Sequence, residues 1–169
     1  MLKEAIEASK PMVLDADGLH GFATLRLQSS APIIVTPHAG EAAMLLETTS
    51  DDIQADRVAA VEKLAQRVAG VAVLKGAGSL IAESRKAGPL LVGVCGHGNP
   101  GMASAGMGDV LSGVIGGLLA QGLSPAQAAV RGVCLHSAAA DAAAKQVGQR
   151  SLLATDLLEP MMDMLRERG

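Results

Sequence analysis

Short apolar runs that each end in a polar or glycine-containing turn limit most strongly what this chain can fold into. Five such runs occur, at 12–14, 33–35, 71–74, 80–82 and 90–92. An unbroken apolar run of this length is typical of a strand buried on both faces. Helical segments alternate with the first runs, whereas the last two flank a turn at 85–88 and predict a hairpin. We therefore expect an α/β fold, one domain over 1–169, with a largely parallel sheet flanked by helices.

The segment 50–69 has the clearest helical periodicity. Apolar side chains recur along one side of it, from Val58 through Val61 to Val68, and Gly70 follows as a stop signal. We expect one continuous amphipathic helix here.

Residues 109–120 also have helical spacing, but their other faces carry Gly113, Gly116 and Gly117. A glycine inside a helix costs about 1 kcal/mol relative to alanine. Three of them together predict that a neighbouring element packs very close. We expect this helix to be buried on all sides.

Charge balance and missing residue types exclude several classes of function. The chain carries 14 Lys and Arg against 17 Asp and Glu, for a formal net charge of −3, and has one Phe but no Trp or Tyr. Without a basic surface or stacking rings we expect no nucleic-acid and no membrane partner. Cys95 and Cys134 form no CxxC motif, so we expect free thiols in a reducing cytoplasm.

Polar and glycine-rich clusters follow the predicted strands. They comprise Asp15 with Asp17, residues 36–41, residues 75–79 and residues 96–109. In sheets of this kind ligands bind beyond the carboxyl ends of the strands, so we expect the clusters to meet at one site. Ordinary turns use the same residue types, so each cluster alone is also compatible with a plain loop.

The glycine-rich stretch before residue 109 suits an anion. Gly106 and Gly108 allow the backbone to approach a ligand, and together with Met107 they lead into a helix whose first amides form an anion hole. Asp109 at this helix start can accept a proton from a hydroxyl group that attacks phosphorus. A capping aspartate on a glycine-rich turn explains the same residues equally well.

Two further clusters each leave two interpretations open. Residues 75–79, Lys-Gly-Ala-Gly-Ser, offer a cation, flexible backbone and a hydroxyl group for a nucleotide, or form a turn with a surface lysine. Their spacing is not that of a Walker A loop. His38 is suited to bind a substrate, or is satisfied by Glu41 three residues later. Asp15 and Asp17 cap a turn or hold a cation through water. The remaining histidines have no assigned role: His20, His97 and His136.

Several of these segments, taken in order, resemble the C-terminal domain of the YjeF family, the ADP-dependent NAD(P)H-hydrate dehydratases, which have a ribokinase-like fold. The matching segments are Val13 to Leu19, Val35 to Glu41, Val73 to Ser79, Asn99 to Leu119 and Leu152 to Leu158. The Thr-Pro-His and Lys-Gly-Ala-Gly segments are more specific than the Gly-Asp loop, which many ribokinase-like kinases share. The family domain begins well before the segment that matches Met1, so we expect a chain truncated at its N-terminus. An exposed apolar sheet edge would then favour a homo-oligomer, or pairing with the missing N-terminal epimerase/dehydratase segment.

The resemblance implies a lyase that repairs hydrated NADH and NADPH. ADP would phosphorylate the hydroxyl group of the hydrate, and loss of phosphate would restore the double bond and leave AMP. Asp109 would be the catalytic base and would bind the hydrate together with His38, while Mg²⁺ would offset phosphate charge. The nucleotide would contact Lys75, Gly76, Ala77, Gly78, Ser79 and Gly108. The alternatives are an ATP-dependent small-molecule kinase and a non-catalytic nucleotide-binding remnant.

Overall fold

A five-stranded mixed sheet forms the centre of the computed structural model, which describes residues 2–25 and 29–166. Its strands lie in chain order: β1 (Met12–Leu14), β2 (Ile33–Val35), β3 (Val71–Leu74), β4 (Ser79–Glu83) and β5 (Leu90–Cys95). The first three are parallel, and β4 and β5 form the expected antiparallel hairpin. The parallel part and the hairpin are as predicted from the apolar runs.

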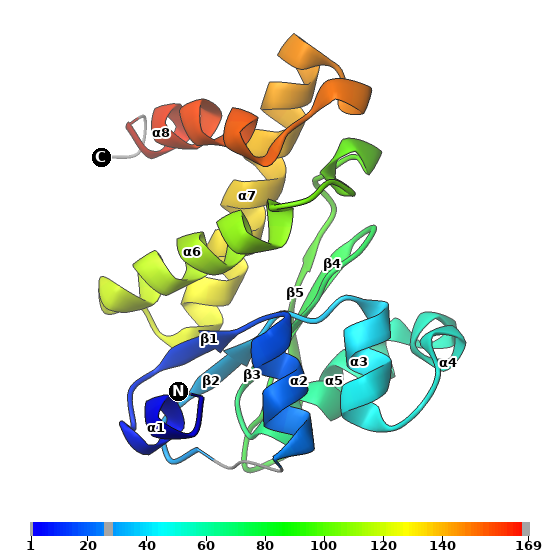
Figure 1. Cartoon of the computed structure of the whole chain (residues 1–169), viewed down its shortest axis with the longest axis vertical. Coiled ribbons are helices and arrows are strands. Elements are labelled where there is room, and N and C mark those ends of the chain that lie inside the picture. Colours follow the sequence, from blue (N-terminus) through cyan, green and yellow to red (C-terminus); the bar gives the residue numbers. More distant parts are fainter. Residues whose placement is uncertain (1, 26–28, 167–169) are drawn as a thin grey trace.

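Helices cover both faces of the sheet (Figure 1). One layer contains α2 (Asp17–Thr24), α3 (Ala39–Leu46), α4 (Ser50–Ala55) and α5 (Arg57–Val68), with α1 (Leu2–Glu7) beside α2. The other contains α6 (Met107–Ala120) and α7 (Pro125–Val147), with α8 (Leu158–Arg166) packed on α7. Short 3₁₀ helices are η1 (Pro100–Met102), η2 (Gln149–Ser151) and η3 (Ala154–Leu157). Within the described residues, none of these helices combines the length and apolar character that a bilayer crossing requires.

The alternation of side chains along the strands explains why the sheet carries two helical layers. Ile33 and Val35 of β2 pack into the core with α2, α3 and α5, whereas Ile34 between them packs toward α6 and α7. Neighbouring strand residues point to opposite faces, so an unbroken apolar run buries both faces at once.

The expected single helix over 50–69 is two helices, α4 and α5, that meet at Asp56. This residue has φ −143° and ψ 82°, outside the helical region, and its carboxylate accepts a hydrogen bond from the Ala59 amide at 2.9 Å. Aspartate favours such caps over helix interiors, so the chain restarts here. Val58 then falls in the first turn of α5 with 44% of its surface exposed, and the expectation that it joins the apolar stripe was wrong.

The glycines of α6 face open space, so the expectation of a helix buried on all sides was also wrong. A Cβ atom built at Gly113, Gly116 or Gly117 would meet nothing within 4 Å. The buried residues of α6 are Met107, Leu111 and Ile115. The close approach between helices occurs instead at Gly132 of α7, where a Cβ atom would lie 2.6 Å from Cγ1 of Ile115.

Candidate active site

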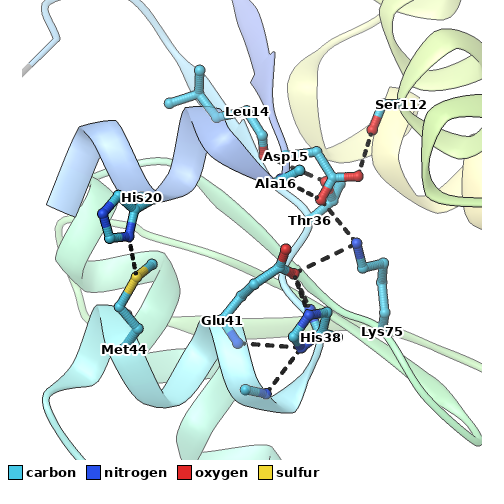
Figure 2. Close-up of polar contacts among 11 residues, drawn as sticks. Leu14, Asp15, Ala16, His20, Thr36, His38, Glu41, Met44, Lys75 and Ser112 are labelled. Atoms are coloured by element: carbon cyan, nitrogen blue, oxygen red, sulfur yellow. Dashed lines mark hydrogen bonds and ion pairs between the residues drawn. The ribbon is translucent and has the colours of Figure 1, made fainter.

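Three strand ends bring charged side chains together at the carboxyl edge of the sheet (Figure 2). Asp15 follows β1, Glu41 lies in the first turn of α3 after β2, and Lys75 follows β3. The Lys75 ammonium lies 2.8 Å from Asp15 Oδ1 and 3.7 Å from Glu41 Oε2. The predicted meeting of the clusters is therefore confirmed for these three strand ends.

The N-terminus of α6 lies directly against this charged group. Gly106 caps the helix with φ +84°, a left-handed conformation that favours glycine. A Cβ atom built at Gly108 would lie 3.1 Å from Asp15 Oδ2 and 3.6 Å from Lys75 Nζ. The amides of a first helical turn have no partner within the helix. Backbone amides and an ammonium group thus meet in one place, which suits an anion such as a phosphate group.

The helix itself begins two residues earlier than residue 109. Met107 opens α6 and is buried, and Asp109 is the exposed third residue of the helix. An exposed carboxylate in a first turn is stabilised by the helix dipole and remains open to a bound molecule. The geometry thus leaves Asp109 able to accept a proton.

Asp15 is the residue whose importance the sequence did not reveal. Burial alone would raise its pKa, but the hydrogen bond and charge of Lys75, the Ala16 amide and the Ser112 hydroxyl together hold the pKa below its ordinary value. Asp15 Oδ2 accepts the hydrogen bond from Ser112 Oγ at 3.1 Å. Ser112 was missed as well, although it lies four residues after Gly108 and so shares its helix face.

His38 makes the contacts with Glu41 that one of its two interpretations predicted. Its Nδ1 accepts hydrogen bonds from the amides of Gly40 at 3.0 Å and Glu41 at 3.2 Å, and Glu41 Oε2 accepts from the His38 amide at 2.8 Å. These contacts form a capping box at the start of α3. With Nδ1 as acceptor, the neutral ring carries its proton on Nε2. The side chain is 62% exposed, so Nε2 can donate to a bound molecule.

The rest of the predicted nucleotide loop borders Lys75 without entering the charged group. Its four residues are exposed or half-buried: Gly76, Ala77, Gly78 and Ser79. Ser79 Oγ donates to the Gly76 carbonyl at 3.4 Å. Arg57 of α5 binds the backbone of this loop: its Nη2 donates to the carbonyls of Leu74 at 3.3 Å and Gly78 at 3.2 Å. No local signal within its helix identified Arg57 as a loop contact.

Asp141 of helix α7 forms hydrogen bonds with the first part of the glycine-rich stretch 96–109. Asp141 accepts hydrogen bonds from the Gly98 amide at 2.9 Å and from Asn99 Nδ2 at 3.0 Å. Burial would raise the pKa of Asp141, but these two bonds and the charges of His97 and Lys145 keep it below its ordinary value. His97, Asn99, Asp141 and Lys145 are among the residues that line a hollow of about 500 Å³.

The other unassigned residues lie away from the charged group. His20 Nδ1 is 3.2 Å from Met44 Sδ, between α2 and α3, and Asp17 is the first residue of α2. His136 is buried beneath the first turn of α6, where burial lowers its pKa to about 4 against an opposing hydrogen bond with the Met107 backbone. Its Nε2 has no partner within the described residues.

This mixed sheet between two helical layers defines a ribokinase-like α/β protein. A solved structure described as a ribokinase-like superfamily protein from Enterococcus faecalis superposes with a TM-score of 0.82 and 25% identity, covering 99% of this chain and 57% of the other. Residues 1–162 match the family model for NAD(P)H-hydrate dehydratase. The chain belongs to this family.

The similar proteins are longer than this chain. The bifunctional NAD(P)H-hydrate repair enzyme of Coxiella burnetii is 50% identical over 157 residues, which are 93% of this chain and 31% of that protein. The ADP-dependent (S)-NAD(P)H-hydrate dehydratase of Neisseria meningitidis is 42% identical over 164 residues, 94% of this chain and 54% of that protein. The Bacillus subtilis ADP/ATP-dependent dehydratase, co-crystallised with ATP/Mg²⁺, superposes with a TM-score of 0.86 and 27% identity, covering 99% and 58%.

Proposed function

We propose that this chain dehydrates the hydrate of NADH or NADPH at the expense of ADP, and so returns the reduced nicotinamide nucleotide. The observation that carries the proposal is the Lys75 ammonium held by Asp15 beside the backbone of Gly108. A cation and free helix amides at one point fit a transferring phosphoryl group. Family membership and the name of the Neisseria meningitidis relative support the same activity.

The chemistry solves a leaving-group problem. Hydroxide leaves carbon poorly, whereas phosphate leaves well. The hydroxyl oxygen of the hydrate attacks the terminal phosphorus of ADP, its proton passes to the Asp109 carboxylate, and the phosphorus–oxygen bond to AMP breaks. The carbon–oxygen bond then breaks with loss of a proton from the adjacent carbon. The products are the restored double bond, inorganic phosphate and AMP.

Each predicted residue has a defined place in this scheme. The amides at 106–108 and the Lys75 ammonium would stabilise charge on the transferring group. His38 would donate from Nε2 to the hydrate, next to Asp109 as the base. The nucleotide would lie along the loop from Lys75 to Ser79 and against Gly108.

Mg²⁺ fits the site only together with phosphate oxygens. The described residues contain no group of three or more His, Cys, Asp or Glu side chains that could hold a metal ion. Mg²⁺ is commonly bound by one or two carboxylates plus substrate phosphates. Glu41 uses Oε2 to contact the His38 amide and Lys75, so we place Oε1 as the protein ligand. The ion would offset phosphate charge.

The outer edge of β1 and the open face of α6 form a second feature of functional interest. They border a hollow of about 420 Å³ lined by Pro11, Met12, Val13, Gly116, Leu119 and Ala120. A free strand edge beside apolar surface favours association with other protein. We infer that a second copy of the chain covers this surface. Its alternative occupant is the N-terminal segment that the family resemblance implies.

The state of the two cysteines indicates the kind of compartment in which the protein functions. Cys95 is buried and Cys134 is exposed, and both are free thiols. Free thiols persist in reducing compartments. We propose a cytoplasmic setting on this basis.

The test of the proposed activity follows the absorbance of the reduced nicotinamide ring after NADPH hydrate is added with ADP, with ATP or without nucleotide. The chain has no Trp or Tyr, so its own near-ultraviolet absorbance is low. We expect recovery that depends on nucleotide and releases phosphate. A stable phosphorylated product formed from ATP would indicate a small-molecule kinase instead. Absence of recovery while ADP still raises the melting temperature would indicate a non-catalytic nucleotide-binding protein.

A further inference from the structure

The carboxylate of Asp15 joins three elements that meet at the charged group. Oδ1 accepts from Lys75 Nζ at 2.8 Å and from the Ala16 amide at 3.0 Å, while Oδ2 accepts from Ser112 Oγ at 3.1 Å. Lys75 directly follows β3, Ala16 is the N-cap residue of α2 and Ser112 lies in α6, and the side chain of Asp15 is only 14% exposed. With both oxygens engaged, the orientation of the carboxylate is fixed.

Electrostatics explain why Lys75 needs this carboxylate. The N-terminus of a helix carries a partial positive charge, so an ammonium group next to it is repelled. Lys75 Nζ nevertheless lies 3.6 Å from the Cβ position of Gly108, in the first turn of α6. Glu41 offers a second carboxylate, but at 3.7 Å and already engaged with the His38 amide. Asp15 is therefore the group that keeps Lys75 at the helix start.

The backbone after Asp15 is also unusual. Ala16 has φ +45° and ψ −120°, a conformation that L-residues rarely adopt. Strain of this kind persists where the surrounding structure imposes it, and it clusters at functional sites. The sharp turn at Ala16 leaves its amide pointing back to Asp15 Oδ1.

We propose that Asp15, anchored to α6 by Ser112, is a positioning residue that holds the Lys75 ammonium where the transferring phosphoryl group binds. This role rests on the function proposed above and adds to it two residues, Asp15 and Ser112. Asp15 acts through Lys75 and needs no contact with ADP or the hydrate.

A double-mutant cycle tests this role. Asp15→Asn keeps the shape of the side chain and removes its charge, and Lys75→Met removes the ammonium group. Hydrogen bonds between charged groups are among the strongest in proteins, so we expect Asp15→Asn to lower kcat about tenfold or more. The KM for the hydrate stays unchanged. In the Lys75→Met background the same change has little further effect, because its partner is gone.

Two more variants separate positioning from general stability. Ser112→Ala removes only the hydrogen bond to Asp15 Oδ2. We therefore expect a smaller loss of kcat, which disappears in the Asp15→Asn background. Asp17→Asn makes the same chemical change two residues away at an exposed position and leaves kcat unchanged. A melting temperature measured for each variant shows whether the fold is retained.

Several outcomes overturn the proposal. A wild-type kcat in Asp15→Asn would do so. So would a double variant whose loss of kcat equals the product of the losses in Asp15→Asn and Lys75→Met, as expected if the role of Asp15 is purely structural. If the parent chain shows no turnover, the proposed function fails, and the same cycle is measured by calorimetry as ADP affinity. Multiplying losses of affinity, or no ADP binding by the parent, then overturn the role of Asp15.

Discussion

Asp109 lies in the first turn of α6 and Asp15, after β1, lies against the same helix, yet the surroundings of the two carboxylates differ. Asp15 is tied to Lys75 and Ser112, whereas Asp109 is exposed on the first helical turn. A carboxylate with both oxygens hydrogen-bonded is suited to position a neighbouring side chain, whereas an exposed carboxylate is suited to accept a proton from a bound substrate.

We expect Asp109→Asn to lower turnover at least about 100-fold, the usual contribution of a general base. Affinity for ADP, measured by calorimetry, stays near that of the parent, because the variant keeps the backbone amides. Asp163→Asn, the same change on exposed α8, should alter neither quantity. Turnover of Asp109→Asn close to the parental rate would contradict the assigned role.

His136 gives the protein a pH-dependent stability. Its pKa is lowered from 6.5 to about 4 in the folded chain, chiefly by burial. Between these values the unfolded state binds more protons, so the free energy of unfolding falls as pH drops from 6.5 toward 4. The shift corresponds to a loss of about 3 kcal/mol by pH 4.

Urea unfolding of the parent and His136→Gln at pH 7.5 and pH 4.5 measures this contribution. The parent should lose more stability on acidification than the variant. His20→Gln, also at an exposed position, should lose as much as the parent. Equal losses in the parent and His136→Gln would contradict the account.

At the residue scale, sequence pattern found the groups that meet at the proposed phosphate site but not their partners. Lys75 and Gly108 were recognisable because a buried strand and a glycine-rich turn mark them. Asp15 binds Lys75 across 60 residues and Ser112 across 97, and local spacing carries no information about such distant pairs. Whether Asp109 and His38 act as assigned stays a prediction.

At the scale of elements, helices α6 and α7 pack through a glycine on α7 rather than those on α6. Gly132 lies against Ile115, whereas the glycines of α6 face open space. Glycine composition alone predicted close packing on the wrong helix, because it does not show which face meets a neighbour.

We expect Gly113→Ala to raise the free energy of unfolding by about 1 kcal/mol, because alanine favours the helix and its Cβ meets nothing. Gly132→Ala should lower it by about 1–3 kcal/mol, since its Cβ would overlap Ile115. Urea titration of both variants checks the contrast. A destabilised Gly113→Ala would contradict an open face on α6.

The five strands were predictable because unbroken apolar runs leave few other structures. The break between α4 and α5 was not, because the periodicity of 50–69 continues across Asp56 while the aspartate caps a new helix. Apolar pattern therefore gave the layers of the fold more reliably than the ends of its helices.

At the scale of the whole molecule, the surface between β1 and α6 is where we propose that a second copy of the chain binds. Gly116 lines this hollow, and a Cβ atom there would meet no atom within 4 Å. Gly116→Lys therefore adds a charge to the surface without disturbing the core.

We expect the parent chain to sediment as a dimer at high concentration and Gly116→Lys as a monomer, because a buried unpaired charge opposes association. Gln66→Lys adds the same charge at an exposed position of α5 and should leave the dimer intact. A monomeric parent would contradict self-association and leave the implied N-terminal segment as the occupant.

In the proposed reaction, the hydroxyl oxygen of the hydrate leaves as part of the phosphate. The most direct test uses NADPH hydrate whose hydroxyl oxygen is ¹⁸O, converted with ADP and the parent chain, with phosphate analysed by mass spectrometry. Phosphoryl transfer to that oxygen predicts one ¹⁸O atom in each inorganic phosphate, formed together with one AMP and one NADPH. Unlabelled phosphate with the ¹⁸O released as water would show direct loss of hydroxide and contradict the account.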